Sequence, residues 1–80
     1  MEKSEIYDTL NEVFRDVFDD EVLVLNENTT ADDIEDWDSL EHINLMVAVE
    51  TAFGIKFNMG EVNSFKNVGA MVDSIQNKLA

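Results

Sequence analysis

The sequence lacks the residues that cross-link small proteins and those that break helices. None of its 80 residues is cysteine or proline, and only three are glycine. Without cysteine there are no disulfides and no thiolate metal sites, so a hydrophobic core must supply the stability. A chain this short buries only about 60% of the surface that its unfolded form exposes. The scarcity of proline and glycine favours helices over a turn-rich β fold.

Basic residues are also scarce. Five lysines and arginines stand against eighteen acidic residues, which gives a net charge of −13. Nucleic acid and anionic membrane surfaces are therefore poor partners, whereas basic protein surfaces are good ones. The chain has no apolar run that could span a membrane, and no basic N-terminal region followed by an apolar stretch. We therefore expect a cytoplasmic protein without a signal peptide.

The acidic residues are concentrated in the middle of the chain. No lysine or arginine lies between Arg15 and Lys56. Twelve acidic residues occupy this interval: Asp16, Asp19, Asp20, Glu21, Glu27, Asp32, Asp33, Glu35, Asp36, Asp38, Glu41 and Glu50. Most of them precede a single serine, Ser39. The simpler interpretation is a solvated acidic surface, but the crowding favours electrostatic steering of a basic enzyme toward this serine.

Helical periodicity predicts a first helix over residues 4–18, with Ser4 as its N-cap. Residues 19–38 then form a long connection. The apolar run 22–25 is expected to bury across the helix ends rather than form a strand, because no second strand could pair with it. Thr30 to Asp33 resembles a capped single turn, after which Ile34 and Trp37 are expected to pack inward.

A second helix is predicted over residues 39–53, closed by Gly54 at the C′ position. This segment is apolar over most of its circumference, which is typical of a helix at the centre of a bundle. A narrow polar or small stripe is expected to face solvent: Glu41, Asn44, Ala48 and Thr51.

The last quarter of the chain predicts a short helix over residues 59–63, with Val62 inward, and a final helix capped by Asn67. The buried stripe of the final helix is expected to be Val68, Met71, Val72, Ile75 and Leu79. Gly69 costs this helix about 1 kcal/mol relative to alanine, and close packing would explain it. The predicted fold is an all-α four-helix bundle with a short third helix and a long first loop, forming a single domain over residues 1–80.

The start of the second helix offers an unusual chemical setting. Asp38 and Glu41 have N-cap-to-N3 spacing, so Asp38 can accept from first-turn N–H groups while Glu41 reaches back to the N–H of Asp38. Ser39 would then be the first helical residue. Its side chain would be exposed beside unpaired N–H groups and the positive end of the helix dipole, which is favourable for an attached phosphate.

Two alternative chemistries were weighed at this position. A hydrolase could use Ser39 with His42, three residues later, but no glycine-rich elbow or oxyanion loop surrounds the serine. We therefore expect His42 to be a partly exposed helix residue near Asp38 or Glu41. A calcium loop of the EF-hand type needs a central glycine, and none lies in this acidic region. We predict no dedicated metal site and no catalytic residue; weak surface binding of divalent ions stays open.

The sequence resembles the acyl carrier proteins of the phosphopantetheine-binding family. The similarity covers most of the chain and rests on these residues: Asp38-Ser39-Leu40, Ile43, Leu45, Glu50, Phe53-Gly54-Ile55 and Asn67-Val68. It implies that Ser39 carries 4′-phosphopantetheine, installed from coenzyme A by a phosphopantetheinyl transferase. The terminal thiol would hold an acyl group as a thioester and present it to other enzymes. The chain itself would then be a carrier and not an enzyme.

The resemblance also implies roles for other residues. Asp38 would help to position the metal during the transfer reaction. A helix face would dock on basic patches of partner enzymes, and it comprises Asp38, Leu40, Glu41, Val47 and Glu50. The bundle interior could shelter an acyl chain, with these candidate pocket residues: Leu45, Met46, Val49, Phe53, Ile55 and Val62. The carrier is expected to act as a monomer.

The sequence departs from many fatty-acid carriers in the residues before the serine. Trp37 stands in a Trp-Asp-Ser-Leu sequence where such carriers have Gly-Ala-Asp-Ser-Leu, and Asn44 and Thr51 replace frequent acids. This form is more similar to free-standing carriers of specialised pathways. Fatty-acid, polyketide or related biosynthesis is expected, with an aminoacyl or peptidyl carrier as the alternative. A non-covalent acidic adaptor, which would use the same helix face, also stays open.

Overall fold

The computed structural model describes residues 1–79, and over these residues it contains helices and no strand. The elements are α1 (Lys3–Val17), a 3₁₀ turn η1 (Ala31–Asp33), α2 (Ser39–Phe53), α3 (Met59–Val62) and α4 (Val68–Leu79). The helical bundle predicted from the sequence, with a short third helix and a long first loop, is confirmed.

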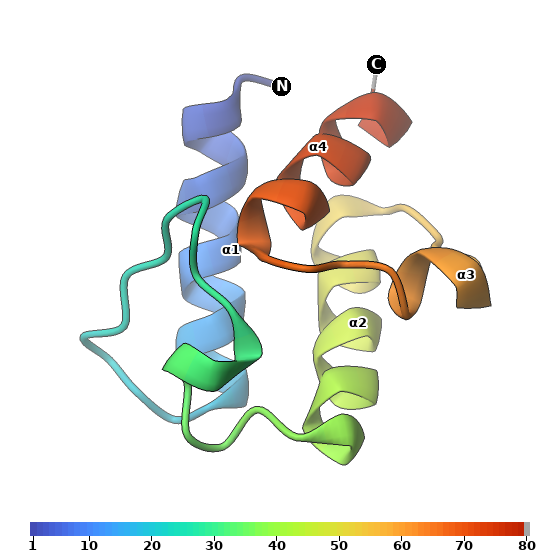
Figure 1. Cartoon of the computed structure of the whole chain (residues 1–80). Coiled ribbons are helices and arrows are strands. Elements are labelled where there is room, and N and C mark those ends of the chain that lie inside the picture. The colour runs from blue at the N-terminus through green and yellow to red at the C-terminus, as the bar shows by residue number, and fades with distance from the viewer. Residues whose placement is uncertain (80) are drawn as a thin grey trace.

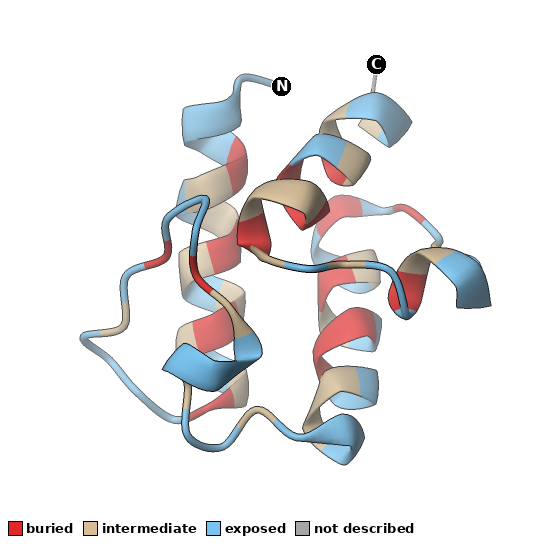
Figure 2. Cartoon of the chain, in the orientation of Figure 1, coloured by how far each residue is buried: buried red, intermediate tan, exposed pale blue. Residues whose placement is uncertain are grey.

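The core lies where α1, α2 and α4 meet. The helices α1 and α2 run in opposite directions, and α1 packs against both α2 and α4 (Figure 1). Their buried faces point toward one another (Figure 2). The innermost side chains are fully buried, and they include Ile6, Leu10, Phe14, Leu45, Val49, Val68, Met71 and Ile75. These residues repeat at helical spacing, so burial of apolar surface selects the faces that pack.

The first helix begins earlier than the sequence suggested. Glu2, not Ser4, is the N-cap, and its backbone N–H donates to Glu5 Oε1 at 3.1 Å. The predicted Ser4 cap was therefore wrong, because Glu2 and Glu5 cap the helix two residues earlier. The predicted end near Phe18 is confirmed. Phe18 is the C-cap, and Asp19 follows in a left-handed conformation with φ 51°.

The long loop between α1 and α2 buries only part of its apolar run. Leu25 is buried and Leu23 is half-buried, but Val22 and Val24 are 83% and 69% exposed. The expectation that the whole run would bury was wrong, because successive side chains of an extended segment point to opposite sides. The loop is fixed by Asn11, whose Oδ1 accepts the backbone N–H of Leu25 at 2.8 Å.

The same loop also closes the N-terminus of α4. The N–H of Val68 donates to the Thr29 carbonyl at 2.8 Å, and the N–H of Gly69 donates to the Glu27 carbonyl at 3.0 Å. A Cβ at residue 69 would lie 2.9 Å from that carbonyl oxygen. The close packing suggested for Gly69 is therefore confirmed: this position has room for a hydrogen only.

Gly69→Ala is expected to lower the free energy of unfolding by about 1–2 kcal/mol, measured by urea denaturation. The clash with the loop backbone outweighs the roughly 1 kcal/mol that alanine gains in helix propensity. The matched control is Gly60→Ala, because a Cβ there would meet only the Asn58 side chain, at 3.3 Å. A Gly69→Ala protein as stable as the wild type would contradict this explanation.

The second helix is buried on one side rather than all round. Leu45, Met46, Val49 and Phe53 are buried, and Gly54 closes the helix at φ 66° as predicted. In contrast, the apolar side chains Leu40, Ile43 and Val47 are 70%, 50% and 57% exposed. The predicted central position of this helix was therefore wrong. The helices α1 and α4 cover only one of its sides, since the remaining helix is a single short turn.

The short helix α3 is held by reciprocal capping. Asn58 Oδ1 accepts the Glu61 N–H at 2.8 Å, and Glu61 Oε1 accepts the Asn58 N–H at 2.9 Å. Lys78 from α4 pairs with the same carboxylate at 3.0 Å. The Asn58 hydrogen bond foremost, and then Lys78, hold the pKa of Glu61 below its usual range. Val62 is buried beneath this turn, as predicted.

This depressed pKa makes the contribution of Glu61 depend on pH. Its stabilising effect should be fully present above the ordinary glutamate pKa of about 4.3, and lost as the pH falls through the lower folded value. We expect Glu61→Gln to lower the melting temperature at pH 6, and the difference from wild type to shrink at pH 3. Glu12→Gln, at an exposed position of α1, is the control. A difference that is unchanged at pH 3 would contradict the assignment.

Candidate functional site

Ser39 is the first residue of α2, and its side chain is exposed. Asp38 is the N-cap: its Oδ1 accepts the Glu41 N–H at 2.8 Å, and its carbonyl accepts the His42 N–H at 2.8 Å. The predicted cap and the predicted position of Ser39 are both confirmed. The carboxylate of Asp38 therefore lies beside the serine at the mouth of the helix.

The reciprocal half of the predicted capping box does not form. The N–H of Asp38 donates to the Asp36 carbonyl at 3.1 Å, and Glu41 Oε1 instead accepts from Asn44 Nδ2 at 3.5 Å. The tight turn before the helix satisfies the N–H that Glu41 was expected to bind. Within residues 1–79, the backbone N–H groups of Ser39 and Leu40 donate to no protein acceptor. They remain available to an anion on the serine.

His42 does not pair with Asp38 or Glu41. Trp37 Nε1–H donates to His42 Nδ1 at 3.0 Å, and His42 Nε2 lies 2.8 Å from the Val62 carbonyl oxygen. The indole N–H can only donate, so Nδ1 is the acceptor and Nε2 carries the proton. The predicted position of His42, partly exposed on the helix, is confirmed, but its ring binds Trp37 and Val62 and not the expected carboxylates. Both ring nitrogens are engaged, which removes the base that a Ser39–His42 hydrolase would need.

Trp37 packs inward, as predicted, and joins the loop to the core. Its ring lies edge-on to Phe14 with centroids 5.3 Å apart, and it contacts Phe18 at 6.1 Å. It also stacks on His42 at 5.9 Å with an interplanar angle of 24°. The aromatic cluster thus runs from the centre of the bundle to the N-terminal turn of α2. It fixes where Ser39 is presented.

A cleft of about 510 Å³ opens beside the serine, and we name it the Ser39 cleft. The loop, the first turns of α2 and the connector before α4 all contribute to it. Its lining includes Trp37, Ser39, His42, Ile43, Phe65 and Lys66. Within residues 1–79, Lys66 forms no salt bridge. The sequence interpretation missed Phe65 and Lys66; the one available signal was that Lys66 is one of only five basic residues.

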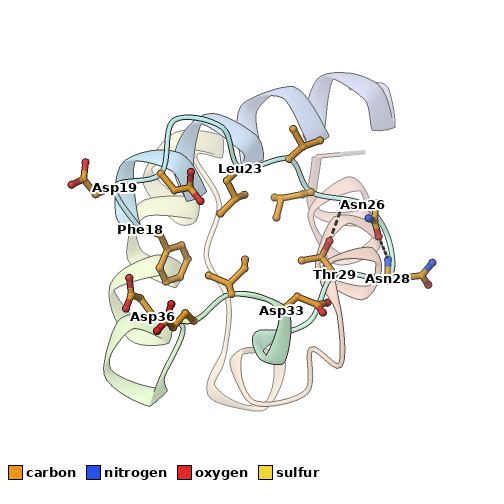
Figure 3. A pocket seen from close by; sticks show the side chains of 13 residues that line it. Phe18, Asp19, Leu23, Asn26, Asn28, Thr29, Asp33 and Asp36 are labelled. Carbon is orange, nitrogen blue, oxygen red and sulfur yellow. Dashed lines mark hydrogen bonds between the residues drawn. The ribbon is translucent and has the colours of Figure 1, made fainter.

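A larger cleft lies away from the serine, beneath the long loop. It measures about 750 Å³ and is drawn in Figure 3. Phe18 and Leu23 line it, together with carboxylates that include Asp19, Asp33 and Asp36. Over residues 1–79, no three His, Cys, Asp or Glu side chains are arranged to hold a metal ion.

The residues predicted to dock on partner enzymes lie in different settings. Asp38, Leu40 and Val47 are exposed, and Glu41 is half-buried. Glu50 is also half-buried, and its Oε2 accepts the Phe57 N–H at 2.7 Å. Glu50 therefore anchors the connector after α2, a role that the sequence did not indicate.

The residues predicted to line an acyl pocket all belong to the packed core. Their exposures are 0% for Leu45, 3% for Met46, 0% for Val49, 8% for Phe53, and 9% each for Ile55 and Val62. None of them lines the Ser39 cleft. Their role in sheltering an acyl chain stays a prediction.

Comparison with protein families gives a match over residues 8–75, to the family described as a phosphopantetheine attachment site. The chain belongs to this carrier family. A solution NMR structure of a holo acyl carrier protein from Geobacter metallireducens is also similar to this carrier. The two are 48% identical with a TM-score of 0.85, and the match covers 91% of this chain and 84% of that one. The comparison with curated proteins found no match.

These similarities confirm three of the predictions made from the sequence. The protein is an acyl carrier and not an enzyme, its fold is the helical bundle of such carriers, and its prosthetic group is covalent 4′-phosphopantetheine. Its general partners are a phosphopantetheinyl transferase and enzymes that handle acyl groups. None of the helices over residues 1–79 is long and apolar enough to cross a membrane.

The Ser39 region fits this prosthetic group. The serine offers an exposed hydroxyl, and two backbone N–H groups beside it have no acceptor among residues 1–79. Lys66, which forms no salt bridge in the described part of the chain, lines the adjoining cleft. A phosphodiester at this position would therefore find hydrogen-bond donors and positive charge in a carrier that is otherwise strongly acidic.

Proposed function

We propose that Ser39 is the residue that carries 4′-phosphopantetheine. The observation that supports this most directly is an exposed serine hydroxyl at the first position of a fifteen-residue helix. The N–H groups of Ser39 and Leu40 have no acceptor in the part of the chain that the structure describes, so a phosphodiester gains hydrogen bonds and the favourable end of the helix dipole. When bound, the group supplies the thiol that holds acyl cargo as a thioester. The carrier's own residues position this attachment point.

The surroundings of Ser39 support a division of labour with the transferase. The side chain next to it, Asp38, is committed through Oδ1 to capping α2, and both nitrogens of His42 are engaged. Neither ring nitrogen of His42 is therefore left to act as a base toward the serine hydroxyl. We infer that the transferase supplies the base, and that Asp38 helps to place the metal ion during transfer with its remaining oxygen.

The cargo is proposed to be an acyl intermediate of fatty-acid, polyketide or related biosynthesis. The 48% identity to a holo acyl carrier protein supports an acyl rather than an aminoacyl or peptidyl cargo. It also makes a non-covalent adaptor the weaker hypothesis. We propose that residues 1–80 act as a single carrier domain and as a monomer.

One labelling experiment tests the attachment site. The protein is incubated with coenzyme A, Mg²⁺ and a broad-specificity phosphopantetheinyl transferase, and its intact mass is measured. Digestion with trypsin then places each serine in a different peptide, because Arg15, Lys56 and Lys66 separate them. The mass gain should appear on peptide 16–56, whose only serine is Ser39. No gain, or a gain on another peptide, would refute the proposal.

A docking surface for the transferase is proposed on the exposed side of α2. Leu40 and Val47 present apolar surface there, with the carboxylates of Asp38 and Glu41 close by in the sequence. Such a surface is complementary to an apolar patch rimmed by lysine and arginine, and the charges would accelerate the encounter. Glu50 is included as a charge, although it is also bonded to Phe57.

Glu41→Lys is expected to slow phosphopantetheinylation several-fold at low salt, measured as the initial rate of adduct formation. The defect should shrink as salt rises, because screening acts over about 8 Å at physiological ionic strength. The matched control is Asp8→Lys, an equal charge change at an exposed position of α1. For residue 50, Glu50→Gln is the cleaner variant, since the amide oxygen can still accept the Phe57 N–H. Equal rates for Glu41→Lys and the control would contradict steering.

A further inference from the structure

We propose that the arm attached at Ser39 rests in the Ser39 cleft, and that Trp37 and His42 form a wall between this cleft and the bundle core. The wall keeps the arm and a short acyl cargo on the surface, and this proposal replaces the prediction that the core residues shelter the cargo. This inference rests on the proposed attachment at Ser39. It makes Trp37 and His42 residues that determine where cargo can go.

The wall is continuous from the loop to α3. Trp37 lines the cleft and packs edge-on against Phe14, which is fully buried. His42 stacks on Trp37 and reaches the backbone carbonyl of Val62, twenty residues away in the chain. The two stacked rings thus link α1, through Phe14, to α3, through the Val62 carbonyl. All three ring nitrogens, one of Trp37 and two of His42, are hydrogen-bonded, and these bonds hold both rings in place.

The core behind the wall is filled. Leu45 and Val49 are completely buried, and Met46 is 3% exposed. A chain that entered the interior would have to displace these side chains, since protein cores pack to crystal density. The Ser39 cleft already offers about 510 Å³ without any rearrangement. An arm on Ser39 therefore meets open space outside the wall and occupied space behind it.

The cleft is chemically complementary to the arm. Lys66 supplies a cation for the phosphodiester, and Asn63 and Asn67 line the cleft with side-chain amides suited to the amide groups of pantetheine. Ile43 and Phe65 add apolar surface for the methyl groups and for short acyl chains. Lys66 forms no salt bridge within residues 1–79, so its charge is available.

NMR contacts on the isotope-labelled holo protein, loaded with a hexanoyl group, test the location of the arm. The carrier has a single tryptophan, so its indole N–H gives one resolved resonance. We expect nuclear Overhauser contacts from the pantetheine methyls to the rings of Phe65 and Trp37, and none from the hexanoyl chain to the methyls of Leu45 or Val49. Contacts to those core methyls in the wild type would overturn the proposal.

Two variants test the wall itself. His42→Ala removes both hydrogen bonds, whereas Trp37→Phe keeps an aromatic ring next to Phe14 but loses the five-membered ring of the indole and its N–H donor. In either variant the hexanoyl chain is expected to gain contacts to Leu45 or Val49. Trp37→Phe also covers the case in which His42→Ala fails to fold. The control is Asn44→Ala, on the exposed side of α2. Unchanged contacts in every folded variant would refute a wall.

The role of Lys66 has its own readout. Lys66→Gln is expected to shift the phosphorus NMR signal of the phosphodiester, and Lys56→Gln, at another exposed lysine, is expected to leave it in place. An identical signal in both variants would exclude Lys66 from the site. If no adduct forms on Ser39 at all, the proposed function fails. If the adduct forms but lacks the expected contacts, only this inference fails.

Discussion

Ser39→Ala is expected to abolish the phosphopantetheine adduct completely while leaving the fold intact. In the attachment that we propose, the Ser39 oxygen forms the bond to phosphorus, so its removal leaves nothing to modify. The side chain is exposed, and the helix cap is supplied by Asp38 and not by the serine. The check is an intact mass after incubation with coenzyme A, Mg²⁺ and the transferase, together with an unchanged helical circular dichroism spectrum.

A second serine provides the matched control for this experiment. Ser64 is also exposed, and its hydroxyl donates to the Glu61 carbonyl at 3.0 Å near the end of α3. Ser64→Ala should be modified at the wild-type rate. An adduct that persists in Ser39→Ala would overturn the assignment, and loss of the adduct in Ser64→Ala would show that the assay responds to structural damage.

Phe14→Ala is expected to have the largest effect on stability. Phe14 is fully buried on α1 and packs against both Phe18 and Trp37, with centroids 5.8 and 5.3 Å away. Truncation of a buried phenylalanine costs about 3–5 kcal/mol. A chain of this size has a total stability of about 4–12 kcal/mol, so much of it would be lost. Urea denaturation followed by circular dichroism gives the change in unfolding free energy.

Phe14→Leu separates cavity formation from the loss of aromatic contacts. Leucine keeps most of the apolar volume, so its cost should be clearly below that of alanine. Because Trp37 is the only tryptophan, its fluorescence reports on the same cluster and should shift toward the solvent-exposed spectrum in Phe14→Ala. A loss below about 1 kcal/mol for Phe14→Ala would contradict the central place of this ring.

The features that could be predicted from the sequence depend on residues close together in the chain. Apolar residues at helical spacing placed α1, α2 and α4 correctly to within a few residues. Short-range capping placed Asp38 before α2, Thr30 before the 3₁₀ turn, and Gly54 after α2. These signals work because the groups involved lie within one helical turn of each other. The exposed position of Ser39 follows from them.

The incorrect predictions concern residues that had more than one possible hydrogen-bond partner or packing neighbour. Glu41 was a reasonable partner for the Asp38 N–H, but a preceding turn supplied the Asp36 carbonyl instead. The apolar residues of α2 did not indicate which side of the helix would stay exposed to solvent, because that depends on where α1 and α4 pack. In the loop, Asn11 binds the Leu25 N–H and so fixes which side of this segment faces the core. Successive side chains point to opposite sides, and Val22 and Val24 are therefore exposed.

The sequence by itself determined the local setting of Ser39, the attachment point that we propose: an exposed serine next to an aspartate cap, at the start of an apolar helix in an acidic chain. Only the tertiary structure decided what surrounds it. The Trp37–His42–Val62 contact joins a loop, α2 and α3 across twenty-five residues, and Lys66 lines the same cleft as Ser39. Local hydrogen bonds can be read from spacing, whereas these contacts exist only after the helices have packed.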